Sequence, residues 1–231
     1  SDGIVKTLIE NLGDRDDNRI LSYLPLAHVF ERAWVGASSL THGRTHVYFA
    51  ESLDTFIQDL NRAKPTMFIS VPRLWLKFQQ GVFSKMPPAK LNLLLSIPLL
   101  GGVVRKKILK GLGLDHVILA GSGSAPIPAE LIVWYRKLGL NLLEGYAMTE
   151  DFAYSHNSTT KINAPGCVGV PLEGVEAKIS PEGEILVKSP GQMVGYYKRP
   201  DLDAESFTAD GFFKTGDQGS QRADGLLKIT G

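Results

Sequence analysis

Residues 140–150 read Leu-Asn-Leu-Leu-Glu-Gly-Tyr-Ala-Met-Thr-Glu, an apolar strand that runs directly into a turn carrying a hydroxyl and a carboxylate. The hydroxyl of Thr149 can bond a phosphate oxygen, and the carboxylate of Glu150 is a hard oxygen ligand suited to Mg²⁺. The ring of Tyr146, just ahead of them, can stack on a base. Strand ends also carry polar residues for ordinary turn chemistry, so the segment gains its meaning from the rest of the chain.

Short apolar strands alternate with helix-length segments over the first two-thirds of the chain. Strands are predicted at residues 19–24, 45–49, 66–71, 116–120 and 140–143. Helices are predicted at residues 4–12, 29–40, 53–63, 73–83 and 128–138, with two further helical runs before residue 112. Strands that are apolar throughout indicate an α/β fold, in which a mostly parallel sheet is covered by helices on both faces.

The composition and periodicity of the sequence change after about residue 163. Gly and Pro punctuate short alternating runs at 175–179, 184–187, 212–214 and 226–229. This pattern predicts a small, distorted β-barrel-like subdomain. We therefore expect an α/β subdomain at residues 1–164 and a β-rich subdomain at residues 165–231.

Composition restricts the class of protein. The 231 residues are 43% hydrophobic and 21% charged, which is typical of a soluble globular protein with a sizeable core. A net charge of +1 provides no basic field for nucleic acid. The single Cys167 excludes an intrachain disulfide and a cysteine-based zinc site, and it favours a reducing, cytoplasmic location. The apolar run at 93–104 is too short to span a bilayer; burial is expected, with a membrane-touching patch as the alternative.

Two further segments could bind a ligand. Residues 121–126, Gly-Ser-Gly-Ser-Ala-Pro, follow a predicted strand, and their small side chains let a flat ligand approach the backbone. Their spacing matches neither G-x-G-x-x-G nor a Walker A loop, so a tight connection is the simpler interpretation. A carboxylate at Asp217 can accept both hydroxyls of a ribose, although a turn Asp before Gly219 is the commoner case.

The histidines and serines offer weaker candidates. His28 follows a predicted strand and begins a helix, where a gating role competes with capping or packing. His42 and His46 have no evident third ligand, which argues against a metal site. Ser122 lies in no full G-x-S-x-G pattern.

Taken in order, these segments resemble the adenylate-forming superfamily, and within it the long-chain acyl-CoA synthetases. The matching segments are residues 21–32, 70–73, 121–126, 144–150, 195–198, 213–217 and 227–231. In that family a fatty carboxylate attacks the α-phosphate of ATP to give acyl-AMP and pyrophosphate, and CoA then displaces AMP. The resemblance implies an acid–thiol ligase with ATP or AMP, Mg²⁺ and CoA as its small-molecule partners.

The resemblance also implies roles for individual residues. Gly123, Ser124, Ala125, Pro126 and Tyr146 would surround the adenine. Thr149 would bond the α-phosphate, Glu150 would hold Mg²⁺, and Asp217 would hold the ribose. His28, Gly145 and Ala147 would lie toward the acyl group, although the family usually has Gly where this chain has Ala147.

The chain begins Ser1-Asp2-Gly3 and stops at Gly231, so it is interpreted as an internal fragment. The family's phosphate-binding loop and its C-terminal domain, with the adenylation lysine, lie outside these residues. We therefore expect the fragment alone to be inactive, because much of the stabilisation of the transition state is missing. Two alternatives stay open: a ligase for an aryl or amino acid, and a non-catalytic module that binds a nucleotide or a partner.

Overall fold

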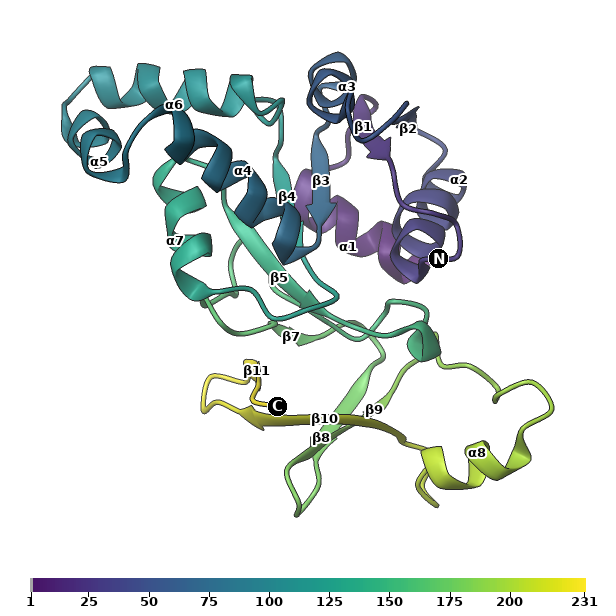
Figure 1. Cartoon of the computed structure of the whole chain (residues 1–231). Helices are drawn as coiled ribbons and strands as arrows, with labels where there is room; N and C mark the ends of the chain where they lie inside the picture. The colour runs from purple at the N-terminus through teal and green to yellow at the C-terminus, as the bar shows by residue number, and fades with distance from the viewer. Residues whose placement is uncertain (1) are drawn as a thin grey trace.

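Two sheets make up the protein (Figure 1). The structure, a computed structural model, describes residues 2–231. The first sheet has seven strands in the order β2-β1-β3-β4-β5-β6-β7, and the second has four in the order β11-β10-β9-β8. The first sheet contains β1 (Asn18–Ser22), β2 (Thr45–Phe49), β3 (Met67–Ser70), β4 (Leu119–Ser122), β5 (Leu142–Tyr146), β6 (His156–Asn157) and β7 (Val170–Pro171). Strands β1 to β5 are parallel, whereas β6 and β7 join antiparallel.

Helices cover both faces of the first sheet, as the sequence predicts. They are α1 (Asp2–Leu12), η1 (Glu31–Ala37), α2 (Ser38–His42), α3 (Phe56–Ala63), α4 (Pro72–Lys85), α5 (Pro88–Ser96), α6 (Leu100–Gly111) and α7 (Ala129–Lys137). Neighbouring residues of one strand enter different cores: Phe68 packs with α3, α4 and α7, while Met67 packs with α1 and η1. This two-sided burial is the reason that these strands are continuously apolar.

A buried aromatic group fixes the loop that follows β4. Trp75 on α4 is fully buried between Phe68 and Tyr135, with edge-on ring contacts at 5.3 and 4.9 Å. Its indole Nε1 donates to the carbonyl of Gly121 at 3.1 Å, and the hydroxyl of Tyr135 donates to the Trp75 carbonyl at 2.7 Å. Helices α4 and α7 are thereby attached to the end of β4.

The second sheet is antiparallel and contains β8 (Glu176–Ile179), β9 (Glu184–Lys188), β10 (Phe213–Gln221) and β11 (Leu227–Ile229). The predicted β-rich character of this part is confirmed. Strand β7 pairs in the first sheet although it follows residue 165; the boundary between residues 164 and 165 itself stays a prediction.

Several elements differ from expectation. The predicted helix at 29–40 forms, but its central segment η1 is a π-helix. The strand expected at 116–120 begins only at Leu119, because residues 114–117 form a hydrogen-bonded turn. Helix α8 (Pro200–Ser206) and strands β6 and β7 were not predicted. The run at 93–104, expected to be buried, instead carries several exposed apolar side chains. In the described part of the chain, no helix is long and apolar enough to cross a membrane.

Candidate functional site

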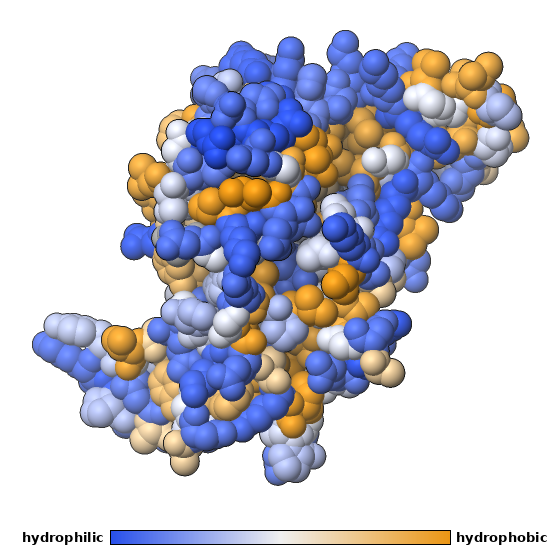
Figure 2. Space-filling view, turned by 180° about the vertical axis from the view of Figure 1, so that it is seen from behind, coloured by the Kyte–Doolittle hydropathy of each residue, from blue (hydrophilic) through white to orange (hydrophobic). Residues whose placement is uncertain are grey.

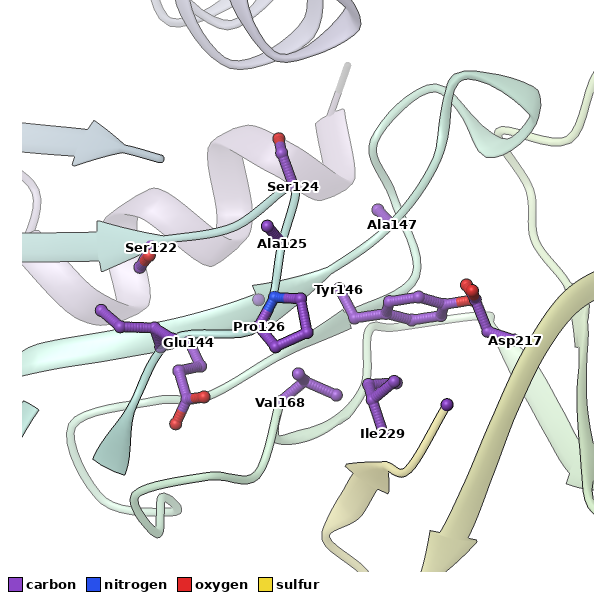
Figure 3. A pocket seen from close by; sticks show the side chains of 13 residues that line it. Ser122, Ser124, Ala125, Pro126, Glu144, Tyr146, Ala147, Val168, Asp217 and Ile229 are labelled. Atoms are coloured by element: carbon purple, nitrogen blue, oxygen red, sulfur yellow. The ribbon is translucent and has the colours of Figure 1, made fainter. Parts of the chain in front are cut away.

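A cavity of about 350 Å³ opens between the end of β5, the loop after β4 and the second sheet (Figure 3). This volume is at the lower end of the range of small-molecule sites, roughly 300–1,000 Å³. Seven of the predicted residues line it: Ser124, Ala125, Pro126, Gly145, Tyr146, Ala147 and Asp217. The β-rich part contributes three more that were not predicted: Val168, Ile229 and Gly231.

The loop after β4 presents Ser124, Ala125 and Pro126 as exposed residues on one wall. Ser124 has a φ of +67°, a conformation that costs a non-glycine residue on the order of 1 kcal/mol and that often occurs at functional sites. Gly123 precedes it, and a Cβ there would meet only the Gly145 carbonyl oxygen, at 3.5 Å. Gly123 itself does not line the cavity, so its predicted nucleotide contact stays a prediction.

The ring of Tyr146 points across the cavity toward Asp217 (Figure 3). Its hydroxyl donates a hydrogen bond of 2.6 Å to Oδ2 of Asp217. Burial and the neighbouring Asp217 carboxylate both raise the pKa of Tyr146, so the phenol remains a donor. This contact joins β5 of the first sheet to β10 of the second.

Asp217 lies inside β10, at the register shift between Lys214 and Gln218. The alternative of an ordinary turn Asp is therefore wrong. Gly216 has a φ of +76°, and such an irregularity re-aims the side chain that follows it.

Two further buried polar residues line the cavity and were not assigned roles from the sequence. Glu144 and Ser122 are paired in register on β5 and β4. Burial raises the pKa of Glu144 from 4.5 to about 7, against the opposing effects of the Gly166 amide, 2.8 Å away, and of Arg136. Among the described residues, the Ser122 hydroxyl has no hydrogen-bond partner. An acidic residue inside an apolar strand is the sequence signal that could have indicated this pair.

A second cavity of about 430 Å³ lies beside the first and shares Asp217 with it. Glu150 lines this second cavity, and its Oε1 accepts a 3.0 Å hydrogen bond from the Tyr196 hydroxyl. Thr149 lines neither cavity; it is exposed at the start of the 3₁₀ turn η2 (Thr149–Asp151). Eight of the predicted residues thus line two adjoining cavities, whereas Thr149, Gly123 and His28 line neither.

Asp151, which the sequence analysis did not single out, holds this turn in place. Its Oδ1 accepts the amides of Met148 at 3.0 Å and Tyr154 at 3.2 Å. Burial raises the pKa of Asp151 to about 6. The turn that presents Glu150 is therefore fixed by its buried neighbour.

His28 lines neither cavity. Its Nδ1 accepts the amide of Phe30 at 3.2 Å, and its carbonyl accepts the amide of Arg32 at 3.2 Å. These contacts are those of a helix N-cap, the capping alternative considered above. A role near an acyl group stays a prediction.

Ala147 fits where the resembled family has Gly. Within residues 2–231, the non-glycine residues with positive φ are Lys64, Leu99, Ser124, Phe152, Ala153 and Lys198. Ala147 is not one of them, so its backbone conformation is open to any residue. Its methyl group contributes to the cavity wall without backbone strain.

Several carboxylates line the second cavity, but the described residues form no preformed set of metal ligands. No group of three or more His, Cys, Asp or Glu side chains in the described chain is arranged to hold a metal ion. Mg²⁺ is usually held by one or two carboxylates together with substrate phosphates and waters. Glu150 on the wall of the second cavity fits that donor set only when a phosphate is also present.

Comparison with known proteins agrees with this geometry. The model of the AMP-binding enzyme family matches residues 3–197. A long-chain-fatty-acid–CoA ligase, FadD15 of Mycobacterium bovis, is 32% identical over 94% of this chain and 40% of its own length. The ATP-bound crystal structure of MatB from Rhodopseudomonas palustris is similar with a TM-score of 0.74 and 27% identity, over 98% of this chain and 42% of that one.

A third similar structure is the A domain of carboxylic acid reductase from Segniliparus rugosus, in complex with AMP and a carboxylic acid. It has a TM-score of 0.69 and 28% identity, over 90% of this chain and 34% of that one. The chain belongs to the AMP-binding, adenylate-forming enzyme family. It spans about 40% of the length of the long-chain ligase it matches.

Proposed function

We propose that this chain is the nucleotide-binding part of a ligase that activates a long-chain fatty acid as acyl-AMP and transfers it to CoA. The observation that carries the proposal is the convergence of Ser124, Tyr146 and Asp217 on one cavity of nucleoside size. The long-chain preference is supported by the similarity to FadD15. The whole reaction belongs to a longer protein of which these residues are a part.

The residues suggest a division of work. The loop at 124–126 and the Tyr146 ring form a base platform, and the Asp217 carboxylate accepts the two hydroxyls of the ribose. Thr149, exposed beyond the cavity, donates to the phosphate. Glu150 holds Mg²⁺ together with phosphate oxygens, and the bound ion would neutralise phosphate charge.

Other acids are the main alternative. MatB and the carboxylic acid reductase domain share the fold but bear different names, so a different carboxylic acid is the alternative substrate. The reductase domain, with its bound AMP and carboxylic acid, favours adenylation as the common step. A competition assay with palmitate, malonate and benzoate in the longer protein would decide among the acids.

Binding of AMP to this chain is the direct test. Two or three charge-assisted hydrogen bonds contribute about 1.5–3 kcal/mol each, and association costs at least about 4 kcal/mol, so a millimolar Kd is expected. Calorimetric titration of AMP should show at least about tenfold weaker binding for Asp217→Asn. Asp224→Asn is the matched control, because Asp224 lines neither cavity. Equal binding by parent and Asp217→Asn would overturn the assignment of the ribose site.

Acyl-CoA formation should distinguish the 231-residue chain from the longer protein. The 231-residue chain should form no acyl-CoA from ATP, Mg²⁺, palmitate and CoA. In the longer protein the reaction should proceed, and Glu150→Ala should abolish most of it. Full activity of Glu150→Ala would contradict the metal-binding role, and turnover by the short chain would show that the catalytic groups lie within it.

A further inference from the structure

The hairpin formed by α5 and α6 ends in an exposed apolar tip. Leu93, Leu99 and Val103 have exposed fractions of 64%, 93% and 64%, and Ile97 and Leu100 lie beside them at 40% each. In the space-filling view, orange atoms gather at the corner of the molecule where this hairpin lies (Figure 2). Contiguous apolar surface of this kind marks a contact with a protein or a membrane.

The backbone at the tip of the hairpin has a defined, closely packed conformation. The amide of Gly101 donates to the carbonyl of Ile97 at 2.9 Å, and a Cβ at Gly101 would come within 2.5 Å of the Leu95 carbonyl oxygen. Gly101 therefore allows α6 to cross α5 closely. Leu99 has a φ of +64°, which is strained for a leucine, and yet its side chain gains no burial. The fold holds an apolar side chain in water at a conformational cost.

The rest of the hairpin is anchored to the core. Leu91 on α5 is fully buried, and Val104 and Ile108 on α6, with Leu112 just after it, pack against the same core. The exposed tip is therefore the outward face of a packed element. In Figure 1 the hairpin stands at the end of the molecule away from the second sheet. No residue of α5 or α6 lines either cavity.

All the charged residues on and around the hairpin are positive. Residues 60–114 contain ten Lys and Arg and no Asp or Glu, whereas the remainder of the chain holds fifteen basic and twenty-four acidic residues. On and beside the hairpin these are Lys85, Lys90, Arg105, Lys106, Lys107 and Lys110. Within residues 2–231, none of these six has a carboxylate within ion-pair distance.

We propose that the α5–α6 hairpin docks on an anionic phospholipid surface. Leu93, Leu99 and Val103 enter the boundary between headgroups and acyl chains, and the surrounding lysines contact lipid phosphates and carboxylates. An apolar face combined with unpaired basic residues is the composition of interfacial helices that bind anionic membranes. Nucleic acid would use the charge but would leave the leucines in water, so lipid accounts for both halves of the surface.

Flotation of the 231-residue chain with vesicles tests the docking. Vesicles of phosphatidylcholine and phosphatidylserine should carry the protein, while phosphatidylcholine alone should carry much less, and added salt should release it. Lys106→Gln with Lys107→Gln should weaken partitioning by about fivefold per lysine. Lys137→Gln with Lys161→Gln, two exposed lysines outside the hairpin, should leave it unchanged.

Separate variants test the contribution of the exposed apolar side chains to vesicle binding. Leu93→Ser with Leu99→Ser should reduce vesicle binding at least about tenfold, since each leucine loses its apolar transfer energy. Leu40→Ser, at an equally exposed leucine outside the hairpin, should have no effect. Because all these side chains are exposed, circular dichroism should show that the variants keep the parent fold. If a leucine variant is misfolded, the vesicle binding of the Lys106→Gln, Lys107→Gln protein decides the test.

A fluorophore reports the position of the tip directly. With Cys167→Ser as background, Leu99→Cys labelled with an environment-sensitive dye should shift to the blue when anionic vesicles are added. The same label at Leu40→Cys should not shift. No blue shift at position 99, or equal binding to zwitterionic and anionic vesicles, would overturn the proposal.

The lipid-docking proposal would also be overturned if protein, rather than lipid, covers the α5–α6 tip. If the chain sediments as a dimer and Leu99→Ser makes it a monomer, a second copy covers the tip. If position 99 is protected from labelling in the longer protein without lipid, another part of that protein covers it.

Discussion

The hydroxyl of Tyr146 donates a 2.6 Å hydrogen bond to the carboxylate of Asp217, seventy-one residues further along the chain. The two residues belong to β5 and β10, in different sheets, and both line the first cavity. This single contact brings together the base platform and the ribose-binding carboxylate of the proposed site.

Removing that hydroxyl should weaken the fold. Tyr146→Phe leaves the Asp217 carboxylate without its donor, and a lost hydrogen bond to a charged group costs about 1.5–3 kcal/mol. Asp217 is half-buried and remains hydrated in part, so we expect the free energy of unfolding to fall by about 1–2 kcal/mol in urea denaturation. Tyr197→Phe, at a tyrosine that is 87% exposed, is the control and should cost nothing measurable.

Glu144 should make the protein less stable as the pH rises. Burial raises its pKa from 4.5 to about 7, so the folded state favours the protonated carboxyl. That stabilising contribution is complete below pH 4.5 and is lost as the pH rises through 7, with an upper limit of about 3 kcal/mol. Urea denaturation at pH 5 and pH 8 should show a smaller decline for Glu144→Gln than for the parent. Glu182→Gln, in an exposed turn, should decline as the parent does; an identical decline for Glu144→Gln would refute the assignment.

His156 should act in the opposite direction at lower pH. Burial lowers its pKa from 6.5 to about 4, so the folded state favours the neutral imidazole. Its contribution is complete above pH 6.5 and is lost as the pH falls through 4, again by about 3 kcal/mol at most. His156→Asn should therefore flatten the acid limb of the stability profile measured by thermal unfolding. His116→Asn, at an exposed histidine, should leave that limb unchanged.

Gly169 should be irreplaceable for steric reasons. It has a φ of +93°, and a Cβ there would overlap the carbonyl of Asn157 on the neighbouring strand β6. Gly169→Ala should lower the free energy of unfolding by more than about 3 kcal/mol, because strain adds to overlap. Gly225 has a similar φ of +84° with nothing within 4 Å, so Gly225→Ala should cost only about 1–2 kcal/mol. Similar denaturant midpoints for the two variants would show that β6 yields to the added methyl.

The sequence predicted the parallel strands of the first sheet well because the signal for these strands is local. Met67 and Phe68 enter opposite cores, and a strand buried on both faces has to be apolar at consecutive positions. Helix α1 likewise ends at Leu12 before Gly13, whose φ of +79° suits its capping position. These features depend on neighbours in the chain and can be read without knowing the tertiary structure.

The second sheet and the site were less predictable because their causes are distant. Asp217 reads as a turn residue, and only its pairing with β9 places it at a register shift inside a strand. Helix α8 has no buried residue, so it carries no apolar periodicity; its Asp203 accepts the amide of Tyr196 at 2.7 Å. The raised pKa of Glu144 depends on burial beneath the segment around Gly166, twenty-two residues away.

The uneven distribution of charge along the chain has a consequence for orientation. The segment 60–114 is strongly positive and the remainder is negative, although the total is only +1. The molecule is therefore an electric dipole, and a field from any charged surface exerts a torque on it before contact. Near an anionic surface the α5–α6 end turns inward, and the negative remainder, which includes the carboxylates of both cavities, turns toward the solution.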